Sequence, residues 1–391
     1  MIVVTFNFRV GLYGFLTGAA VKENGDLNSG FLDQQKALLW VQKHISSFGG
    51  DPENVTLFGT SAGAGSTLLH TLAYGNRAKS TKPLFHAIIA ADPFVPEFFT
   101  VPELEFQYQE ILNATKCSSI TCLRSLSTSK LQAANINRPF PGQNTNPLFG
   151  FSPCVDGSLF PARPSKLLAE GWFQHVPLLQ GTVANEGSIF APHVNGTSEF
   201  ASFLSAQFPK LNVSGINEHY SYIPLSPSGS VNSPYFDRLE LAYGDASFTC
   251  FGLDFASKFA AAGIPVYSFL YNVLDPNLVE LGLGVPHTWE VGAVWGPGNA
   301  LNLAIPKSAN SYENINSNVV PIVQAYWTSF ARTHDPNTLR VYGSPTWKRW
   351  GRGLAGQRLK IQTNATIMET ISRQQVKNCE FWKTRSQQLV H

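Results

Sequence analysis

The chain has 391 residues, 43% of them hydrophobic, enough to bury a sizeable core as one large domain or two ordinary ones. Its 28 Lys and Arg against 26 Asp and Glu leave a net charge of only +2, which argues against a polyanionic partner or an anionic membrane surface. The apolar run at residues 84–99 is broken by charges and prolines, short of the roughly 20 apolar residues of a spanning helix, so no transmembrane segment is predicted.

The first segments read as a strand followed by a helix. Residues 2–8 are mostly β-branched or aromatic, which predicts a buried strand. No positively charged residues precede them and no cleavage site with small residues follows, so they are not a signal peptide. Residues 31–45 have the length and period of a helix, opened by Asn28 or Ser29 and stopped at the pair Gly49-Gly50.

The same alternation continues along the chain. Residues 64–74 predict a second helix that ends at Gly75, and strands are expected at 55–58, 86–90, 176–179, 265–271 and 359–361. Strands that alternate with helices indicate an α/β fold with a mostly parallel sheet. The Pro/Ser-rich residues 224–234 predict a surface loop rather than a linker, so we expect a single domain over residues 1–391.

A serine surrounded by small residues lies between the strand at 55–58 and the helix at 64–74. The sequence "FGTSAGAGST" contains Gly-x-Ser-x-Gly around Ser61, the pattern of a nucleophile elbow. Gly59 and Gly63 are expected because so tight a turn leaves no room for bulk. The N–H of Ala62, at the start of the helix, could then bind a developing oxyanion.

A nucleophilic serine needs a histidine base, which follows the acid on this type of fold. His287 comes after the strand at 265–271 and a loop ending in "LGLGVP", which places it at a carboxyl end of the sheet, where α/β sites assemble. The alternative is a histidine that only packs among Trp289, Val291 and Trp295. Four other histidines are less suitable as the base. His193 and His219 lie in polar segments, His334 lies in a turn, and His391 is the last residue.

Glu186 is the best candidate for the acid because it follows the strand at 176–179 at the same sheet end. Asp156 competes, but its turn sequence favours a structural role. Glu290 either supports His287 or is an ordinary surface charge, and the sequence leaves both open. His287-x-x-Glu290 has no second histidine at metal-ligand spacing, and no dinucleotide or phosphate-loop motif occurs, so neither a metal nor a cofactor is predicted.

The cysteines and glycosylation triplets bear on where the protein resides. Cys117 and Cys122 could close a small loop, Cys250 and Cys379 lie far apart, and Cys154 makes the count odd. Buried thiols of a cytosolic protein are the alternative. The cysteines together with the Asn-x-Ser/Thr triplets lead us to predict a secreted protein with oxidised cysteines, whose targeting segment is not in this sequence. The triplets begin at Asn54, Asn113, Asn195, Asn212 and Asn364, the last four being the candidate glycosylation sites.

Several blocks of the sequence resemble the type-B carboxylesterases, the family of cholinesterases and of secreted fungal esterases and lipases. The resemblance spans nearly the whole chain and implies an α/β-hydrolase fold. It also implies an ester hydrolase that needs no cofactor, with Ser61 as nucleophile, Glu186 as acid and His287 as base. The blocks are "FNFRVGLYGFL", "SGFLDQQKALLWVQKHISSFGGDPENVTLFGTSAGAGS", "ANEGSIF" and "HTWEVGAVWG".

The resemblance further implies covalent and ionic links. It pairs Cys117 with Cys122 and Cys250 with Cys379, which leaves Cys154 free. It also implies a structural ion pair between Arg9 and Asp33. The expected substrate is a small-molecule or lipid ester, and nothing indicates a nucleic-acid partner or fixes the oligomeric state.

The chain departs from the family at three places. Thr60 stands where the family has Glu, and "AADPF" near Ala90 replaces the family's "QSG". The family's long segment before "FNFRVG", with early strands and a glycine-rich oxyanion loop, has no counterpart here, and Gly49-Gly50 cannot supply that loop. We therefore expect an N-terminally truncated chain. Its alternatives to an active esterase are a catalytically impaired fragment and a non-catalytic cholinesterase-like binding domain.

Overall fold

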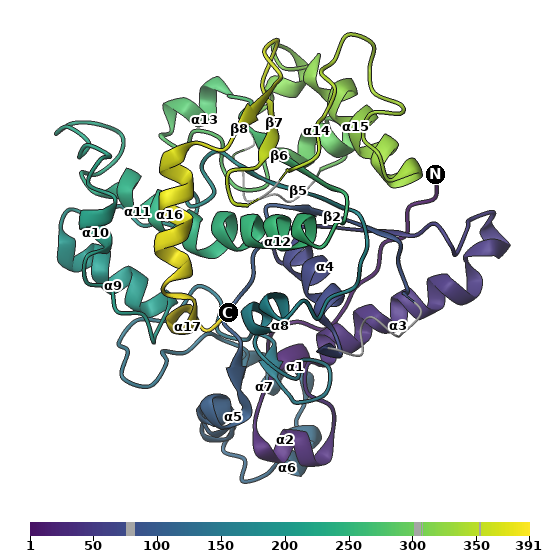
Figure 1. Cartoon of the computed structure of the whole chain (residues 1–391). Helices are drawn as coiled ribbons and strands as arrows, with labels where there is room; N and C mark the ends of the chain where they lie inside the picture. Colours follow the sequence, from purple (N-terminus) through teal and green to yellow (C-terminus); the bar gives the residue numbers. More distant parts are fainter. Residues whose placement is uncertain (76–82, 301–305, 307, 352) are drawn as a thin grey trace.

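The computed structural model describes residues 1–75, 83–300, 306, 308–351 and 353–391 (Figure 1). Its main sheet has the strand order β1-β2-β5-β6-β7-β8, and every neighbouring pair is parallel except β7 with β8. The predicted mostly parallel sheet is confirmed. The strands are β1 (Thr56–Thr60), β2 (Ala87–Ala91), β5 (Leu178–Val183), β6 (Val266–Tyr271), β7 (Gln357–Ile361) and β8 (Ile367–Thr370), with a separate pair β3 (Phe99–Thr100) and β4 (Cys154–Val155).

Helices cover both faces of this sheet. In Figure 1, α14 and α15 lie at the upper right, and α4, α8, α12 and α16 lie below and in front of the strands. The helices are α1 (Gly11–Phe15), α2 (Ala19–Asn24), α3 (Ser29–His44), α4 (Ala62–Leu72), α5 (Val101–Thr115), α6 (Ile120–Ser125), α7 (Thr128–Ala134), α8 (Pro164–Ala169), α9 (Thr197–Gln207), α10 (Ile216–His219), α11 (Phe236–Gly244), α12 (Cys250–Ala261), α13 (Pro276–Glu280), α14 (Val291–Trp295), α15 (Val319–Thr333), α16 (Arg373–Lys383) and α17 (Ser386–Leu389).

The central strands are buried on both faces, as parallel strands between two helix layers must be. Successive side chains of a strand point to opposite faces. In β2, Ile88 packs in the core that includes Leu68 of α4 and Phe255 of α12. Its neighbour Ile89 packs in the core that includes Val323 of α15. The sheet therefore separates two hydrophobic layers.

Helix α3 matches its prediction in extent but not in its cap. It begins at Ser29 after Asn28, whose backbone is left-handed with φ 55°. The Asn28 side chain caps nothing. Its Nδ2 donates instead to the Cys154 carbonyl at 3.0 Å and to Asp156 at 2.8 Å. Asn28 thus fastens the start of α3 to a segment more than a hundred residues away.

The prediction of a buried strand at residues 2–8 is wrong. These residues form no strand pairing, and Ile2, Val4 and Phe6 are 43%, 40% and 40% exposed. A strand requires a neighbour for its backbone groups, and none of the described strands pairs with this segment. A cavity of about 630 Å³ is lined both by residues 1–6 and by Thr56, Leu57 and Phe58 of β1.

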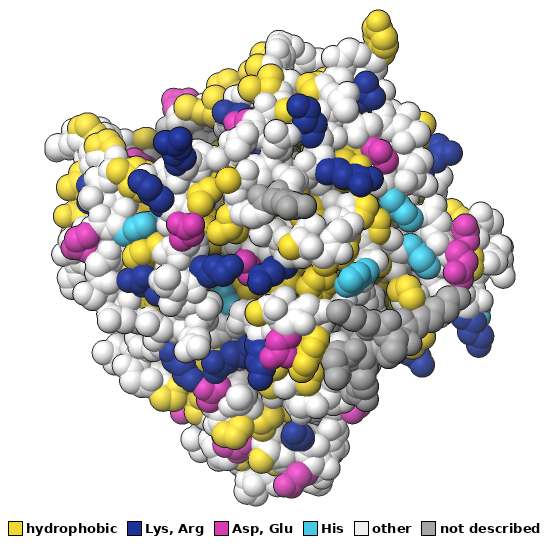
Figure 2. Space-filling model, viewed as in Figure 1, with side chains coloured by type: hydrophobic (Ala, Val, Ile, Leu, Met, Phe, Trp, Pro, Cys, Tyr) yellow, Lys and Arg dark blue, Asp and Glu magenta, His cyan; other side chains and the backbone are white. Residues whose placement is uncertain are grey.

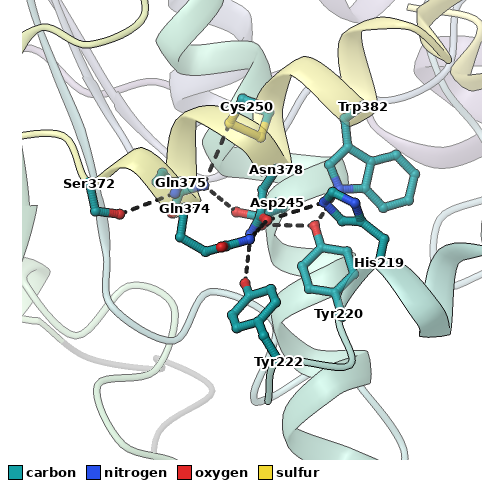
Figure 3. Close-up of a disulfide and its surroundings, with 11 residues drawn as sticks. His219, Tyr220, Tyr222, Asp245, Cys250, Ser372, Gln374, Gln375, Asn378 and Trp382 are labelled. Carbon is teal, nitrogen blue, oxygen red and sulfur yellow. Dashed lines mark hydrogen bonds between the residues drawn. A yellow bond between two sulfur atoms is a disulfide. The ribbon is translucent and has the colours of Figure 1, made fainter.

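A buried polar network and a disulfide hold α16 against the body of the protein (Figure 3). Between α11 and α12 the chain forms a π-helix over Asp245–Thr249, and Asp245 is 1% exposed. Its carboxylate accepts hydrogen bonds from Tyr220 Oη at 2.8 Å, Gln375 Nε2 at 2.7 Å and Asn378 Nδ2 at 2.8 Å. Burial raises the pKa of Asp245 to about 6, and these donors limit the rise.

Both disulfides implied by the resemblance are confirmed. Cys117 is bonded to Cys122 on α6, and Cys250 on α12 is bonded to Cys379 on α16. Cys154 is the free cysteine, fully buried, and burial raises the pKa of its thiol to about 11. The expected ion pair is also present, with Arg9 Nη2 at 2.7 Å from Asp33 Oδ1.

On the face shown in Figure 2, charges of the two signs are interspersed. Lys and Arg side chains occur in separate small groups among acidic, apolar and uncharged ones on the face shown in Figure 2. In the described ranges, no helix combines the length and the apolar character needed to cross a membrane. The triplet asparagines are all exposed, at Asn54, Asn113, Asn195, Asn212 and Asn364.

Candidate active site

Ser61 occupies the sharp turn between β1 and α4. Its backbone is left-handed, with φ 59° and ψ −127°, a strained conformation for a residue with a side chain. Two hydrogen bonds hold the turn: Ser61 N donates to the Ala91 carbonyl at 3.0 Å, and Phe94 N donates to the Ser61 carbonyl at 3.1 Å. The turn is thereby tied to the residues on either side of Asp92, just after β2.

The glycines around Ser61 differ in whether a larger side chain would fit. A Cβ added at Gly59 would lie 2.2 Å from the backbone of Gly63, because β1 passes close to the first turn of α4. One added at Gly65 would lie 1.8 Å from the Phe94 carbonyl oxygen. At Gly63 it would meet nothing within 4 Å. The expectation of crowding is right for Gly59 and wrong for Gly63 within the described residues.

Backbone hydrogen bonds between their two loops bring Glu186 and His287 together. Asn185, after β5, forms an isolated parallel bridge with Pro286, so the next residue of each loop lies side by side. Asn185 also donates its N–H to the Val285 carbonyl and accepts the Val285 N–H on its side chain, each at 3.0 Å. His287 Nδ1 lies 2.6 Å from Glu186 Oε2, a hydrogen bond between buried side chains.

Further carboxyl groups surround this pair. Asp92 Oδ2 lies 3.9 Å from His287 Nδ1, and both Asp92 and Glu290 are 0% exposed, so the reading of Glu290 as a surface charge is wrong. Burial, with Asp92 next in effect, raises the pKa of Glu186 and of Glu290 well above the usual range. Burial lowers the pKa of His287 to about 4, and Asp92 opposes the shift.

The imidazole ring of His287 packs against aromatic side chains. Its ring centroid lies 4.5 Å from that of Phe248 and 5.2 Å from that of Phe190. Phe248 also contacts Phe94, whose N–H holds the Ser61 turn. His287 Nε2 is buried without a hydrogen-bond partner among the described residues, so the expected bond to Ser61 Oγ is not formed. Catalytic hydrogen bonds are often long without substrate.

Asp92, Glu186 and His287 form the cluster in the described residues whose atoms lie close enough to suggest a metal site. The 2.6 Å separation of Glu186 Oε2 from His287 Nδ1 argues otherwise. Two ligands held about 2.1 Å from one tetrahedral zinc ion would lie about 3.4 Å apart. The pair has the separation of a hydrogen bond, and the cluster does not fit a shared metal.

The other candidates lie elsewhere. Asp156 accepts the N–H groups of Ser158 and Phe160 at 2.8 and 3.0 Å, the structural turn that the sequence favours. His334 ends α15 with a left-handed backbone. His219 contacts Asn378 beside the Asp245 network. The cavity of about 630 Å³ described above is lined by Gly63 and His70 of α4 but by none of Ser61, Glu186 and His287.

Ala62 is the first residue of α4 and is exposed. The first N–H groups of a helix have no acceptor within it, so the Ala62 N–H can meet a ligand. Sequence reasoning did not select Asp92, although a signal existed. Asp92 directly follows β2 at the carboxyl end of a parallel strand, the same criterion that selected Glu186.

Comparison with known proteins gives consistent matches. Residues 1–382 match the profile of the carboxylesterase family. The chain is similar to secreted lipase 4 of Gibberella zeae, with 29% identity over 89% of this chain and 62% of that protein. It is also similar to carboxylesterase patB of Penicillium expansum, with 30% identity over 88% of this chain and 57% of that protein. The chain therefore spans about three fifths of these relatives.

Among solved structures, the crystal structure of EstA from Aspergillus niger superposes with a TM-score of 0.92 and 38% identity. The match covers 99% of this chain and 74% of that chain. The described sheet and helices thus have the arrangement of that structure over almost their whole extent.

Proposed function

The chain belongs to the carboxylesterase family, and from that membership we propose that it hydrolyses carboxylic esters through an acyl-enzyme. Its α/β-hydrolase fold supports the same proposal. Ser61 is the nucleophile, His287 the general base, Glu186 the acid that orients it, and Ala62 N–H an oxyanion donor. The observation that carries the proposal is the buried 2.6 Å contact between Glu186 and His287.

In the proposed reaction, Ser61 Oγ attacks the ester carbonyl while His287 Nε2 takes its proton. Glu186 accepts the Nδ1–H, which fixes the tautomer that leaves Nε2 free to accept. The protonated ring then gives its proton to the departing alcohol. Water repeats the attack on the acyl-enzyme and frees Ser61. Phe190 and Phe248 cover His287 with apolar surface, which limits competing access of water to the base.

The substrate class and location follow from the relatives and the surface. The relatives are named as a lipase and a carboxylesterase, which supports small-molecule or lipid esters as substrates. One is named as secreted, and the chain itself has disulfides and exposed glycosylation triplets. We infer an extracellular protein.

The proposed function is tested with p-nitrophenyl butyrate and with a fluorophosphonate probe. Turnover and one covalent phosphonyl group per chain, mapped to the Ser61 peptide, are the expected results, because only an activated serine reacts with the probe. Labelling without turnover would indicate the catalytically impaired fragment. Neither turnover nor labelling in folded protein would contradict the proposal and favour a non-catalytic binding domain.

The acid limb of kcat/KM is expected near pH 4 rather than near 6.5. His287 must be neutral to act as a base, and the neutral form prevails above its pKa, which burial lowers to about 4. Activity should therefore persist as the pH falls from 7 to about 5. Rates are measured at constant ionic strength, with circular dichroism at each pH to verify that the protein remains folded. A limb at or above 6.5 would mean that the surrounding carboxylates outweigh burial.

A further inference from the structure

Asp92 is a fully buried carboxylate that the proposed mechanism leaves without a role. It follows β2 with a left-handed backbone, φ 53°, and its N–H donates to the Gly181 carbonyl at 2.8 Å. Its Oδ1 accepts the Val183 N–H at 3.0 Å, the same N–H that Glu186 Oε1 accepts at 3.0 Å. Asp92 and Glu186 therefore share a donor and lie next to each other.

The second oxygen of Asp92 reaches the histidine loop. Asp92 Oδ2 accepts the Thr288 N–H at 2.9 Å and lies 3.9 Å from His287 Nδ1. Thr288 is left-handed, with φ 70°, a conformation costly for a β-branched residue, so this hydrogen bond helps to hold it. Because Thr288 directly follows His287, Asp92 fixes the backbone that aims the imidazole.

On the basis of the proposed esterase function, we propose that Asp92 is a positioning residue for His287 and a second acid of the site. It holds the His287 loop through Thr288, and it becomes the partner of His287 Nδ1 whenever Glu186 cannot accept that proton. The site thus contains two carboxylates for one imidazole. His287 Nδ1 lies 2.6 Å from Glu186 Oε2 and 3.9 Å from Asp92 Oδ2.

The close packing of carboxyl groups explains why a second acceptor for the histidine N–H would be needed. Asp92, Glu186 and Glu290 face one another in a buried space, and neighbouring carboxyls there do not all ionise together. Burial and the charge of Asp92 raise the pKa of Glu186. When Glu186 holds a proton, its oxygen is a poorer acceptor for Nδ1–H. Asp92 Oδ2, at 3.9 Å from His287 Nδ1, is then the second carboxylate near that N–H group.

A double-mutant cycle on Glu186→Ala and Asp92→Asn tests the proposal. With Glu186 present, Asp92→Asn is expected to lower kcat less than about tenfold. With Glu186→Ala, the same change is expected to lower kcat by a further factor of about 30 or more, because Asp92 is then the remaining partner of Nδ1. KM should change little in each variant, and Asp92→Asn alone should move the acid limb to lower pH, because the Asp92 charge opposes the lowering of the His287 pKa.

Glu290→Gln is the matched control. Glu290 is equally buried, and neither of its carboxyl oxygens has a hydrogen-bond partner in the described chain. Glu290 affects the pKa of Glu186 but provides no acceptor for His287 Nδ1–H, so on the Glu186→Ala background Glu290→Gln should lower kcat far less than Asp92→Asn does. Equal costs of Asp92→Asn on both backgrounds would overturn the proposal and leave Asp92 with a purely structural role.

A second measurement needs neither turnover nor a folded Asp92 variant. The Nδ1–H of a histidine that donates to a carboxylate gives a low-field proton resonance, assigned here by its absence in His287→Gln. We expect the resonance to persist in Glu186→Ala, with Asp92 as acceptor, and its loss would overturn the proposal. If it persists in a chain that hydrolyses no ester, the proposed function fails while the assignment of Asp92 stands.

Discussion

Substituting Ser61 by alanine is expected to lower kcat for p-nitrophenyl butyrate by about 10⁴- to 10⁶-fold and to abolish fluorophosphonate labelling. Without the hydroxyl no acyl-enzyme forms, and only uncatalysed attack by water on a bound ester remains. The residue occupies a turn whose bonds run through its backbone, so alanine should preserve the fold. The measurement is turnover and intact mass, with circular dichroism for the fold.

Ser66→Ala is the matched control for this substitution. Ser66 lies on α4, which directly follows Ser61, and among the described residues its Oγ accepts a single hydrogen bond, from Gln34 at 3.3 Å. Its loss should leave turnover and labelling unchanged within about twofold, as for most changes away from a site. Equal loss in both variants would mean that the helix has been disturbed, and retained labelling in Ser61→Ala would remove Ser61 from its proposed role.

Breaking the Cys250–Cys379 disulfide is expected to lower the free energy of unfolding by about 5 kcal/mol in the loop-entropy model, because the bond closes a loop of 129 residues. The Asp245 network also holds α16, to the π-helix that precedes α12, so α16 should remain docked at room temperature and detach on heating. The measurement is urea unfolding of a Cys250→Ser/Cys379→Ser variant, with m-values compared.

Removing the other disulfide provides the control. Cys117→Ser/Cys122→Ser opens a loop of only five residues' separation, for which the same model gives about 2 kcal/mol. Thiol titration of unfolded parent protein should find one free group, Cys154. Similar losses of stability in the two variants would mean that native-state strain or residual structure in the unfolded chain, not loop length, sets the contribution.

Local pattern and chain order were enough to predict the Glu186–His287 contact. A parallel sheet brings the carboxyl ends of its strands to one edge, so polar residues just after predicted strands are candidates for neighbours. The same logic applies to Asp92, but a proline-containing turn gives no sign that both of its oxygens bind backbone N–H groups from other loops. Those contacts depend on the exact approach of three segments.

The wrong strand at residues 2–8 has a different cause. Side-chain type predicts β structure well when a neighbouring strand is available, and the sequence of one segment does not tell whether it is. The π-helix at Asp245–Thr249 was not predictable either. Asp245 at its start accepts hydrogen bonds from Tyr220, Gln375 and Asn378, which are distant in sequence.

The position of β1 has a consequence for how the protein would lose activity. Among the described strands β1 pairs only with β2, and all its residues are partly buried, whereas those of β2 and β5 are fully buried. Local opening is easiest where few contacts must break. Amide hydrogens of β1 should exchange with solvent sooner than those of β5. Because Ser61 directly follows β1, mild heating should disorder the nucleophile while most of the sheet is still intact.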